Sequence, residues 1–154
     1  METGAKINDF KLKGIDAEGN EKTFSLSDFK GKDIVLYFYP KDNTPGCTQE
    51  ACDFRDNYNR LTSKAVVIGV SADNIESHKK FQKQHELNFI LLSDPDHTVM
   101  EQFGAWGEKK MYGKSFLGTV RSTFLIDKDG LLKKSWPNVK VKGHVDEVIE
   151  ELEK

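Results

Sequence analysis

The chain has few cysteines, no long apolar run and little net charge, and each shortage excludes a class of protein. Only two of its 154 residues are cysteine, too few for the disulfide framework of a small secreted domain. No stretch approaches the roughly 18 apolar residues of a membrane-spanning helix, and METGAKINDF at the start lacks the apolar region of a signal peptide. We therefore expect a soluble, cytoplasmic protein with no membrane partner.

The charged residues are balanced and spread along the chain. Lysine and arginine number 23 against 25 acidic residues, which gives a formal net charge of −2 at pH 7. A nucleic-acid-binding surface is basic and clustered, so we expect no nucleic acid as a partner. The length fits a single domain, residues 1–154, and 37% hydrophobic residues are enough to build its core.

Strand and helix patterns alternate along the chain. Apolar segments of strand length lie at 10–16, 22–28, 33–40, 65–73, 89–96 and 119–136, the first two and the last forming hairpins. Helical spacing begins at Pro45 and recurs at 75–87, 96–104 and 144–154, whereas 106–118 is expected to be irregular. This order predicts an α/β domain in which a mixed sheet lies between helices.

The helix that begins at Pro45 carries the first cysteine. Its apolar face is formed by residues in steps of three and four, namely Cys47, Ala51, Phe54, Tyr58 and Leu61. Thr44 suits the N-cap and Pro45 the first helical position. Cys47 is therefore predicted in the first turn of this helix.

This position of Cys47 favours reactivity. Unpaired backbone N–H groups and the positive end of the helix dipole stabilise a thiolate in the first turn. The preceding strand ends at Pro40, and open α/β sheets bind ligands beyond the carboxyl ends of their strands. The alternative is that Cys47 is only a small buried residue on the apolar face.

Cys52 lies five residues after Cys47. In an intact helix this spacing separates the two Cα atoms by about 8.7 Å, whereas a disulfide tolerates at most about 7 Å. A bond between them would therefore require the first turns of the helix to unwind. Zinc sites use closer cysteine spacing and about four ligands, and we expect the four histidines on the surface, so no metal site is predicted.

The segment PKDNTPGCTQEACDFRD resembles the active-site motif of the peroxiredoxins, with Pro40, Thr44 and Cys47 at the family's spacing. The second cysteine is similar to that of the bacterioferritin comigratory protein branch, also called the peroxiredoxin Q type. The resemblance continues through NFILLSDPDH, EQFGAWGEKKMYGKSFLG and VRSTFLIDKDG. It implies a thioredoxin-like fold with an N-terminal β-hairpin extension, and reduction of hydrogen peroxide and organic hydroperoxides.

The resemblance also assigns roles to the two cysteines and to one arginine. Cys47 would be the peroxidatic cysteine and Cys52 the resolving cysteine of the same chain. Their disulfide would be reopened by thioredoxin or a related dithiol protein. Arg121 matches the family's active-site arginine, which would stabilise the thiolate and donate hydrogen bonds to the peroxide; otherwise it is a surface charge at the end of a strand.

Three further residues match the motif with more than one role open. Thr44 would cap the helix, orient the peroxide, or do both. Pro40 would shield the site and fix the loop. Glu50 would buttress Arg121 or favour the helix N-terminus by its charge. Three large aromatic residues would either line the pocket or belong to the ordinary core: Phe38, Trp106 and Trp136.

We expect no cofactor and a monomer, because the resolving cysteine lies in the same chain. The main interpretation is a thiol peroxidase. A redox sensor or chaperone-like protein, switched by oxidation of Cys47, would use the same residues. A non-catalytic scaffold is disfavoured because the motif is complete.

Overall fold

The computed structural model describes the backbone of residues 1–154 and every side chain except that of Met111. The strands are β1 (Lys11–Ile15), β2 (Glu21–Ser25), β3 (Asp33–Phe38), β4 (Ala65–Ser71), β5 (Ile90–Ser93), β6 (Trp106–Met111), β7 (Lys114–Thr119), β8 (Ser122–Ile126) and β9 (Leu132–Trp136). The helices are α1 (Pro45–Asp56), α2 (Tyr58–Thr62), α3 (Ile75–His85), α4 (Thr98–Gln102), α5 (His144–Leu152) and the 3-10 helix η1 (Leu26–Phe29). Among these helices, none has the length and hydropathy needed to span a membrane.

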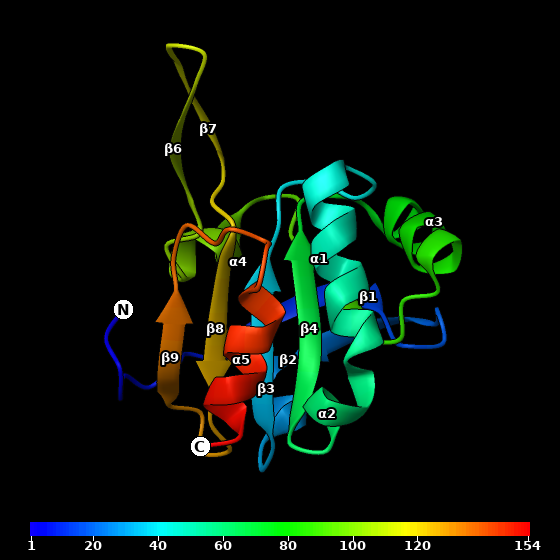
Figure 1. Ribbon diagram of the computed structural model, residues 1–154, viewed down its shortest axis with the longest axis vertical. Coiled ribbons are helices and arrows are strands. Elements are labelled where there is room, and N and C mark those ends of the chain that lie inside the picture. Colours follow the sequence, from blue (N-terminus) through cyan, green and yellow to red (C-terminus); the bar gives the residue numbers. More distant parts are fainter.

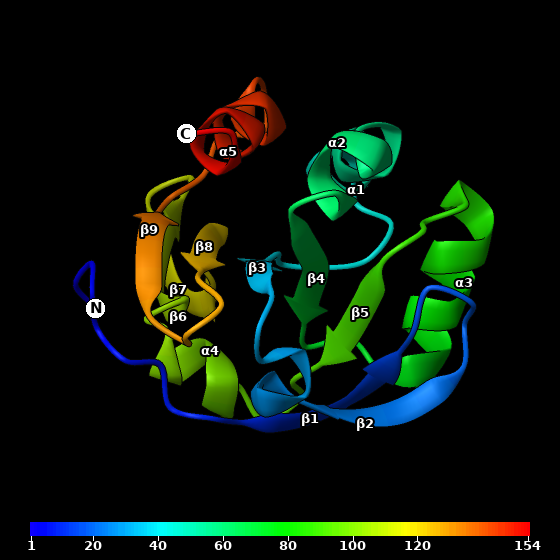
Figure 2. The ribbon, with the colours of Figure 1, turned by 90° about the horizontal axis from the view of Figure 1, so that it is seen from below.

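A seven-stranded sheet forms the centre, in the order β2-β1-β5-β4-β3-β8-β9. The inner strands β3, β4 and β5 are parallel, and the strands on either side pair with them antiparallel. Helices cover both faces (Figure 1, Figure 2). This arrangement confirms the predicted α/β fold with a mixed sheet, including the N-terminal hairpin of β1 and β2.

Alternate residues of the central strands enter two separate cores. Val35 and Tyr37 of β3 face α1, α2, α3 and α5, in the core that also contains Cys47. Leu36 and Phe38 face the opposite way, toward α4 and the N-terminal segment. Phe38 and Trp106 therefore pack on the face of the sheet opposite Cys47, and only Trp136 packs against the core that contains it.

The predicted helix from Pro45 to Leu61 is interrupted at Asn57. The Asn57 amide group donates a hydrogen bond of 2.8 Å to the carbonyl of Asp53, and its backbone leaves the helical region with ψ 19. Such local side-chain bonds compete with helix continuation. The chain restarts as α2, so Tyr58 is 39% exposed and the prediction that it lies on the apolar face was wrong.

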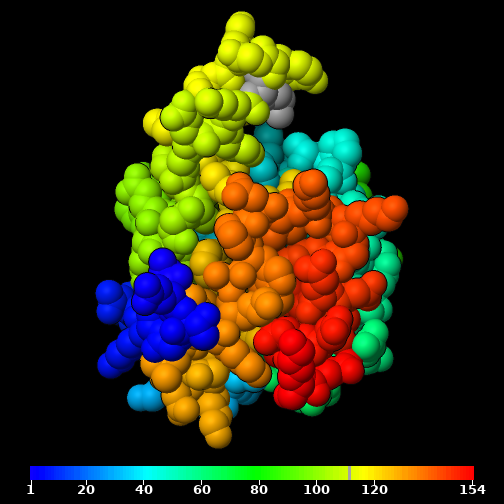
Figure 3. Space-filling view, turned by 60° about the vertical axis from the view of Figure 1, so that its left-hand side comes forward, coloured from blue at the N-terminus to red at the C-terminus, as the bar shows by residue number. Residues whose placement is uncertain are grey.

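The segment 106–118 is a β-hairpin, so the prediction of an irregular stretch was wrong. Residues pair from Trp106 with Thr119 to Met111 with Lys114. The two turn residues, Tyr112 and Gly113, have positive φ of 54 and 75, as a two-residue hairpin turn requires. The hairpin projects from the body of the molecule (Figure 1, Figure 3).

Two of the four histidines are buried, contrary to the expectation that all lie on the surface. His78 and His144 are 0% and 3% exposed. Both are tolerated inside because their ring nitrogens have hydrogen-bond partners: Asp42 and the Leu92 carbonyl for His78, and Thr123 for His144. These tertiary partners lie far away in the sequence, so no local pattern reveals them.

Gly69 provides a test of this packing. A Cβ added there would lie 2.9 Å from the ring of Tyr37, and that ring is fully buried. We expect Gly69→Ala to lower the free energy of unfolding by about 1–3 kcal/mol, measured by urea denaturation. Gly107→Ala is the control, because a Cβ there meets nothing within 4 Å. An unchanged stability of Gly69→Ala would contradict the packing.

Candidate active site

Cys47 occupies the third position of α1, as predicted, and is 1% exposed. Its sulfur accepts a hydrogen bond of 3.2 Å from Nη2 of Arg121. A thiolate at this place gains both from the helix N-terminus and from a charged donor. The local sequence Thr-Pro-Gly-Cys begins the helix, and Arg121 arrives from a distant part of the chain.

Arg121 lies in the short connection between β7 and β8, and its side chain is 17% exposed. It reaches Cys47 because β8 pairs with β3, the strand that leads into α1. Its Nη1 also donates to Oε1 of Glu50 at 2.7 Å. Burial opposes the charge, but the neighbouring Glu50 and Cys47 outweigh burial and raise the pKa of Arg121. The guanidinium is therefore a permanent cation shared by two acidic groups.

Gly46 is part of this arrangement, although the sequence analysis assigned it no role. A Cβ at Gly46 would lie 3.3 Å from Nη2 of Arg121. That distance is tighter than most real Cβ contacts, so any larger residue would press on the guanidinium. The sequence feature that could have indicated this role is a glycine directly before the cysteine at the start of a helix.

Glu50 is completely buried, one helical turn after Cys47. Burial raises the pKa of Glu50 from 4.5 to about 7, although Arg121 acts in the opposite direction. Its second oxygen, Oε2, finds no hydrogen-bond partner among the described residues. Of the two roles considered for Glu50, the contact with Arg121 is the one that the structure contains.

Thr44 stands at the N-cap position of α1, but its side chain does not cap the helix. Its hydroxyl instead donates a hydrogen bond of 2.8 Å to the carbonyl of Lys41. The expected capping bond was therefore wrong, while the expected position was right. The hydroxyl oxygen keeps its capacity to accept a hydrogen bond, so a role in orienting peroxide stays a prediction.

Pro40 lines an open pocket of about 410 Å³ at the end of β3. The same pocket is lined by Arg121, Val120, Val139 and Lys109, the last from the hairpin strand β6. Burial and the nearby Arg121 lower the pKa of Lys109. Lys109 was not singled out from the sequence because the hairpin that carries it was not predicted.

Cys52 is half-buried, and both cysteines are free thiols. They lie in one continuous helix, α1, where a spacing of five residues keeps their Cα atoms about 8.7 Å apart. Arg121 contacts both Cys47 and Glu50, whereas Cys52 must move to reach Cys47. Within the described residues no three histidine, cysteine or acidic side chains are grouped as metal ligands.

Comparison with known proteins identifies the class. The model of the AhpC/TSA family matches residues 3–135, and the chain belongs to this family. Peroxiredoxin Bcp of Bacillus subtilis strain 168 is 54% identical over 153 residues, which cover 99% of this chain and 95% of that protein. Peroxiredoxin Bcp of Escherichia coli K12 is 47% identical over 126 residues, 81% of each chain.

Solved structures lead to the same branch. A mutant of PrxQ from Xylella fastidiosa superimposes with a TM-score of 0.89 at 37% identity, covering 99% of this chain and 96% of that one. A mutant of peroxiredoxin Q from Xanthomonas campestris gives 0.85 at 38% identity, covering 92% and 89%. The resemblance noted in the sequence and the thioredoxin-like fold are thereby confirmed. The activity of this chain is that of a thiol peroxidase, with peroxide substrates and a thiol reductant.

The pKa of Glu50 predicts a pH dependence of stability. The folded state holds the proton of Glu50 up to a pKa of about 7, whereas the unfolded chain releases it near 4.5. The resulting stabilisation is fully present below pH 4.5 and is lost as the pH rises to 7, by roughly 3 kcal/mol. Glutamine does not titrate. As the pH rises from 4.5 to 7, the free energy of unfolding of wild type should therefore fall by this amount relative to that of Glu50→Gln.

Urea denaturation of reduced protein at several pH values between 4.5 and 8 measures this difference. Taking the difference between the two proteins removes the contribution of His144, whose pKa burial lowers to about 4. Replacing the exposed Glu18 by Gln is the control for the exchange of a carboxylate for an amide. A wild-type and Glu50→Gln pair with parallel pH profiles would refute the shifted pKa.

Proposed function

We propose that this thiol peroxidase reduces hydrogen peroxide and organic hydroperoxides through a sulfenic acid on Cys47 and a disulfide between Cys47 and Cys52. Thioredoxin or a related dithiol protein then reopens the disulfide. The observation that carries the proposal is the 3.2 Å hydrogen bond from Arg121 to the Cys47 sulfur at the start of α1. In support, the bacterioferritin comigratory protein of Xanthomonas campestris, whose solved structure is similar to this one, has alkyl peroxide reduction activity.

The first step is attack of the Cys47 thiolate on the terminal oxygen of the peroxide. A sulfur–oxygen bond forms, the oxygen–oxygen bond breaks, and water or an alcohol leaves once the departing oxygen has taken a proton. Negative charge develops on that oxygen, and the remaining N–H groups of Arg121 are suited to stabilise it. Pro40 lines the same pocket as Arg121, and Thr44 is the N-cap residue of the helix that carries Cys47.

The second step joins the two cysteines. The Cys52 thiol attacks the sulfenic sulfur, a disulfide forms and water leaves. Because both residues lie in α1, the turns between them must unwind. Glu50 lies within those turns, so unwinding also breaks its 2.7 Å contact with Arg121. A proton on Glu50 lowers the cost of that separation, because a neutral carboxyl leaves its partner more easily than a buried charge does.

We also propose that the protein works as a monomer in the cytoplasm. Both reactive cysteines are supplied by one chain, so the chemistry needs no second copy. Two cysteines in 154 residues fit a reducing compartment.

A coupled assay tests the proposed function. Consumption of NADPH is followed with thioredoxin reductase, thioredoxin and hydrogen peroxide, comparing wild type with Cys47→Ser. We expect sustained turnover in wild type and only the background without enzyme in the variant. If wild type turns over with dithiothreitol but not with thioredoxin, the reductant is another dithiol. If it consumes a single equivalent of peroxide with both, the protein is a sensor and the proposal is wrong.

Cys52→Ser tests the resolving role. Without a partner thiol, the Cys47 sulfenic acid persists and reacts with a second peroxide to give sulfinic acid. We expect loss of most of the thioredoxin-dependent turnover and more sulfinic acid than in wild type, measured by intact-protein mass spectrometry at increasing peroxide. Equal sulfinic acid in the two proteins would exclude Cys52 as the resolving cysteine.

A further inference from the structure

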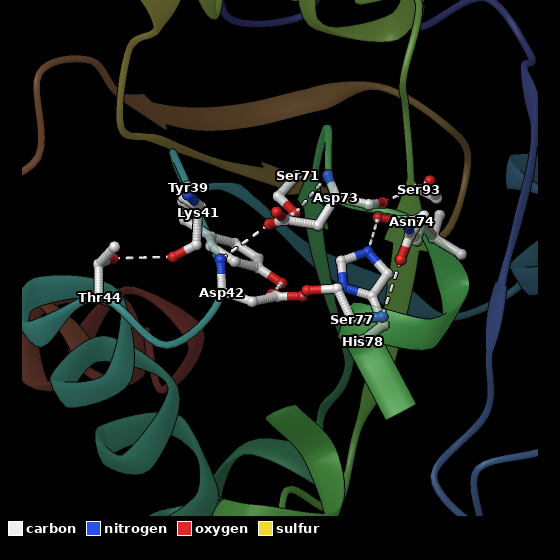
Figure 4. Close-up of polar contacts among 11 residues, drawn as sticks. Tyr39, Lys41, Asp42, Thr44, Ser71, Asp73, Asn74, Ser77, His78 and Ser93 are labelled. Carbon is white, nitrogen blue, oxygen red and sulfur yellow. Dashed lines mark hydrogen bonds and ion pairs between the residues drawn. The ribbon is translucent and has the colours of Figure 1, made fainter. Parts of the chain in front are cut away.

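A buried polar network lies beside the active-site loop and has no part in the chemistry described above. Its centre is the carboxylate of Asp42, two residues before Thr44 and 5% exposed. Oδ1 accepts a hydrogen bond of 2.6 Å from Tyr39, and Oδ2 contacts Ser77 and His78, each at 2.8 Å. Figure 4 shows these side chains converging between the loop and the start of α3.

The backbone of Asp42 is held as well. Its N–H donates to Oδ2 of Asp73 at 2.8 Å, and the same oxygen accepts from the hydroxyl of Ser71 at 2.7 Å. Ser93 in β5 donates to the carbonyl of Asp73. One loop residue is thus tied to the ends of β4 and β5 and to α3 (Figure 4).

The hydrogen-bond partners of His78 require a proton between its ring and Asp42. Nε2 lies 2.8 Å from the carbonyl of Leu92, which can only accept, so Nε2 carries hydrogen. Nδ1 faces a carboxylate oxygen, and two lone pairs would repel each other there. The proton sits on Nδ1 or on Oδ2, and in both cases the pair is neutral as a whole and fully bonded.

The network restrains the turn at Asn43, the residue that follows Asp42. Asn43 has φ 59, a left-handed conformation that asparagine tolerates better than most residues with a side chain. Its Oδ1 is met by Nε2 of His85 at 3.1 Å. This turn is therefore held on one side by Asp42 and on the other by the end of α3.

Helix α3 also holds the far end of α1. Nη1 of Arg55 donates to the carbonyl of His85 at 2.6 Å. Cys47 and Cys52 both lie between Asp42 and Arg55. The segment that must unwind for the disulfide is thus bounded at each end by a residue fixed to α3.

We propose that Asp42 and His78 are positioning residues that anchor the active-site loop and form the fixed hinge at which α1 begins to unwind. The anchor holds the first turn of α1 in the conformation that reacts with peroxide, and it remains in place when residues 43–52 rearrange. This inference rests on the proposed function, because it concerns the two steps of that reaction.

Loss of the anchor should slow the first step of the reaction but not the second. This loss lets the first turn of α1 fray, so the contact between Arg121 and Cys47 is made less often and oxidation by peroxide slows. Misplacement of a reacting group by about 1 Å costs up to a hundredfold in rate. Disulfide formation needs the frayed state and is not slowed. Simple loss of folded protein would instead reduce the reacting fraction and leave both rate constants unchanged.

Stopped-flow tryptophan fluorescence measures both rate constants after mixing with peroxide. In Asp42→Ala we expect the second-order oxidation constant to fall about tenfold or more, with no fall in the first-order constant for the disulfide. Asp42→Asn should recover oxidation to within about threefold, because its amide can donate to a neutral His78 ring and its oxygen can accept from Tyr39. Ser77→Ala, which removes one hydrogen bond to Asp42, should show a smaller change in the same direction and serves if Asp42→Ala does not fold.

Leu132→Ala is the matched control, because it removes buried apolar contacts in β9 and lowers stability by about 2–5 kcal/mol without touching the network. It should leave both rate constants unchanged. The proposal is overturned if Asp42→Ala and Ser77→Ala leave the oxidation constant as in wild type, or if they slow both steps equally.

Hydrogen exchange of reduced protein, read by mass spectrometry, separates this inference from the proposed function. Faster exchange of residues 43–52 in Asp42→Ala, with α5 unchanged, supports the anchor even if wild type forms no disulfide with peroxide, the result that would defeat the proposed function. Unchanged exchange of residues 43–52 overturns the anchor whatever the activity.

Discussion

The guanidinium of Arg121 is the element on which the site depends. It is one partly buried cation in contact with two acids, Glu50 at 2.7 Å and Cys47 at 3.2 Å. A charge in such a place must have a partner, because an uncompensated buried ion is strongly destabilising. The pairing of β8 with β3 delivers Arg121 to the start of α1. The position of Arg121 therefore depends on the sheet topology, and its charge is balanced by two residues in the first turns of α1.

The proposed mechanism requires the same helix, α1, to be both rigid and easily opened. Peroxide reduction needs the first turn of α1 intact, because that turn presents Cys47 to Arg121. Disulfide formation needs the turns up to Cys52 to open. The break at Asn57 limits α1 to 12 residues, and short helices have little stability of their own. Tertiary contacts therefore decide how readily it opens, which is why the restraints at its two ends matter more than helix propensity.

The sequence predicted what local patterns determine and missed what distant contacts determine. The central strands, the start of α1 and the third position of Cys47 follow from apolar spacing and from Thr-Pro-Gly, and these predictions agree with the structure. Arg121 entered only through the family resemblance, because a contact across 74 residues has no local signature. Burial of His78 likewise depends on Asp42, 36 residues away. The hairpin β6–β7 was missed because its turn, Tyr-Gly, is a less familiar signal than Asn-Gly.

Charge balance links the acids around Arg121 through the catalytic cycle. In the proposed cycle, oxidation turns the Cys47 thiolate into an uncharged sulfenic acid, so Arg121 loses one of its two anionic neighbours. Glu50 is the other, and burial gives it a pKa of about 7, so near neutral pH a small change in its surroundings moves the balance between its two forms. Loss of the thiolate favours the ionised form of Glu50, which keeps the guanidinium paired while α1 stays folded. In the molecules in which Glu50 keeps its proton, Glu50 separates from Arg121 at lower cost when α1 unwinds. A glutamine at this position could not compensate the cation after oxidation, because it carries no charge in either state.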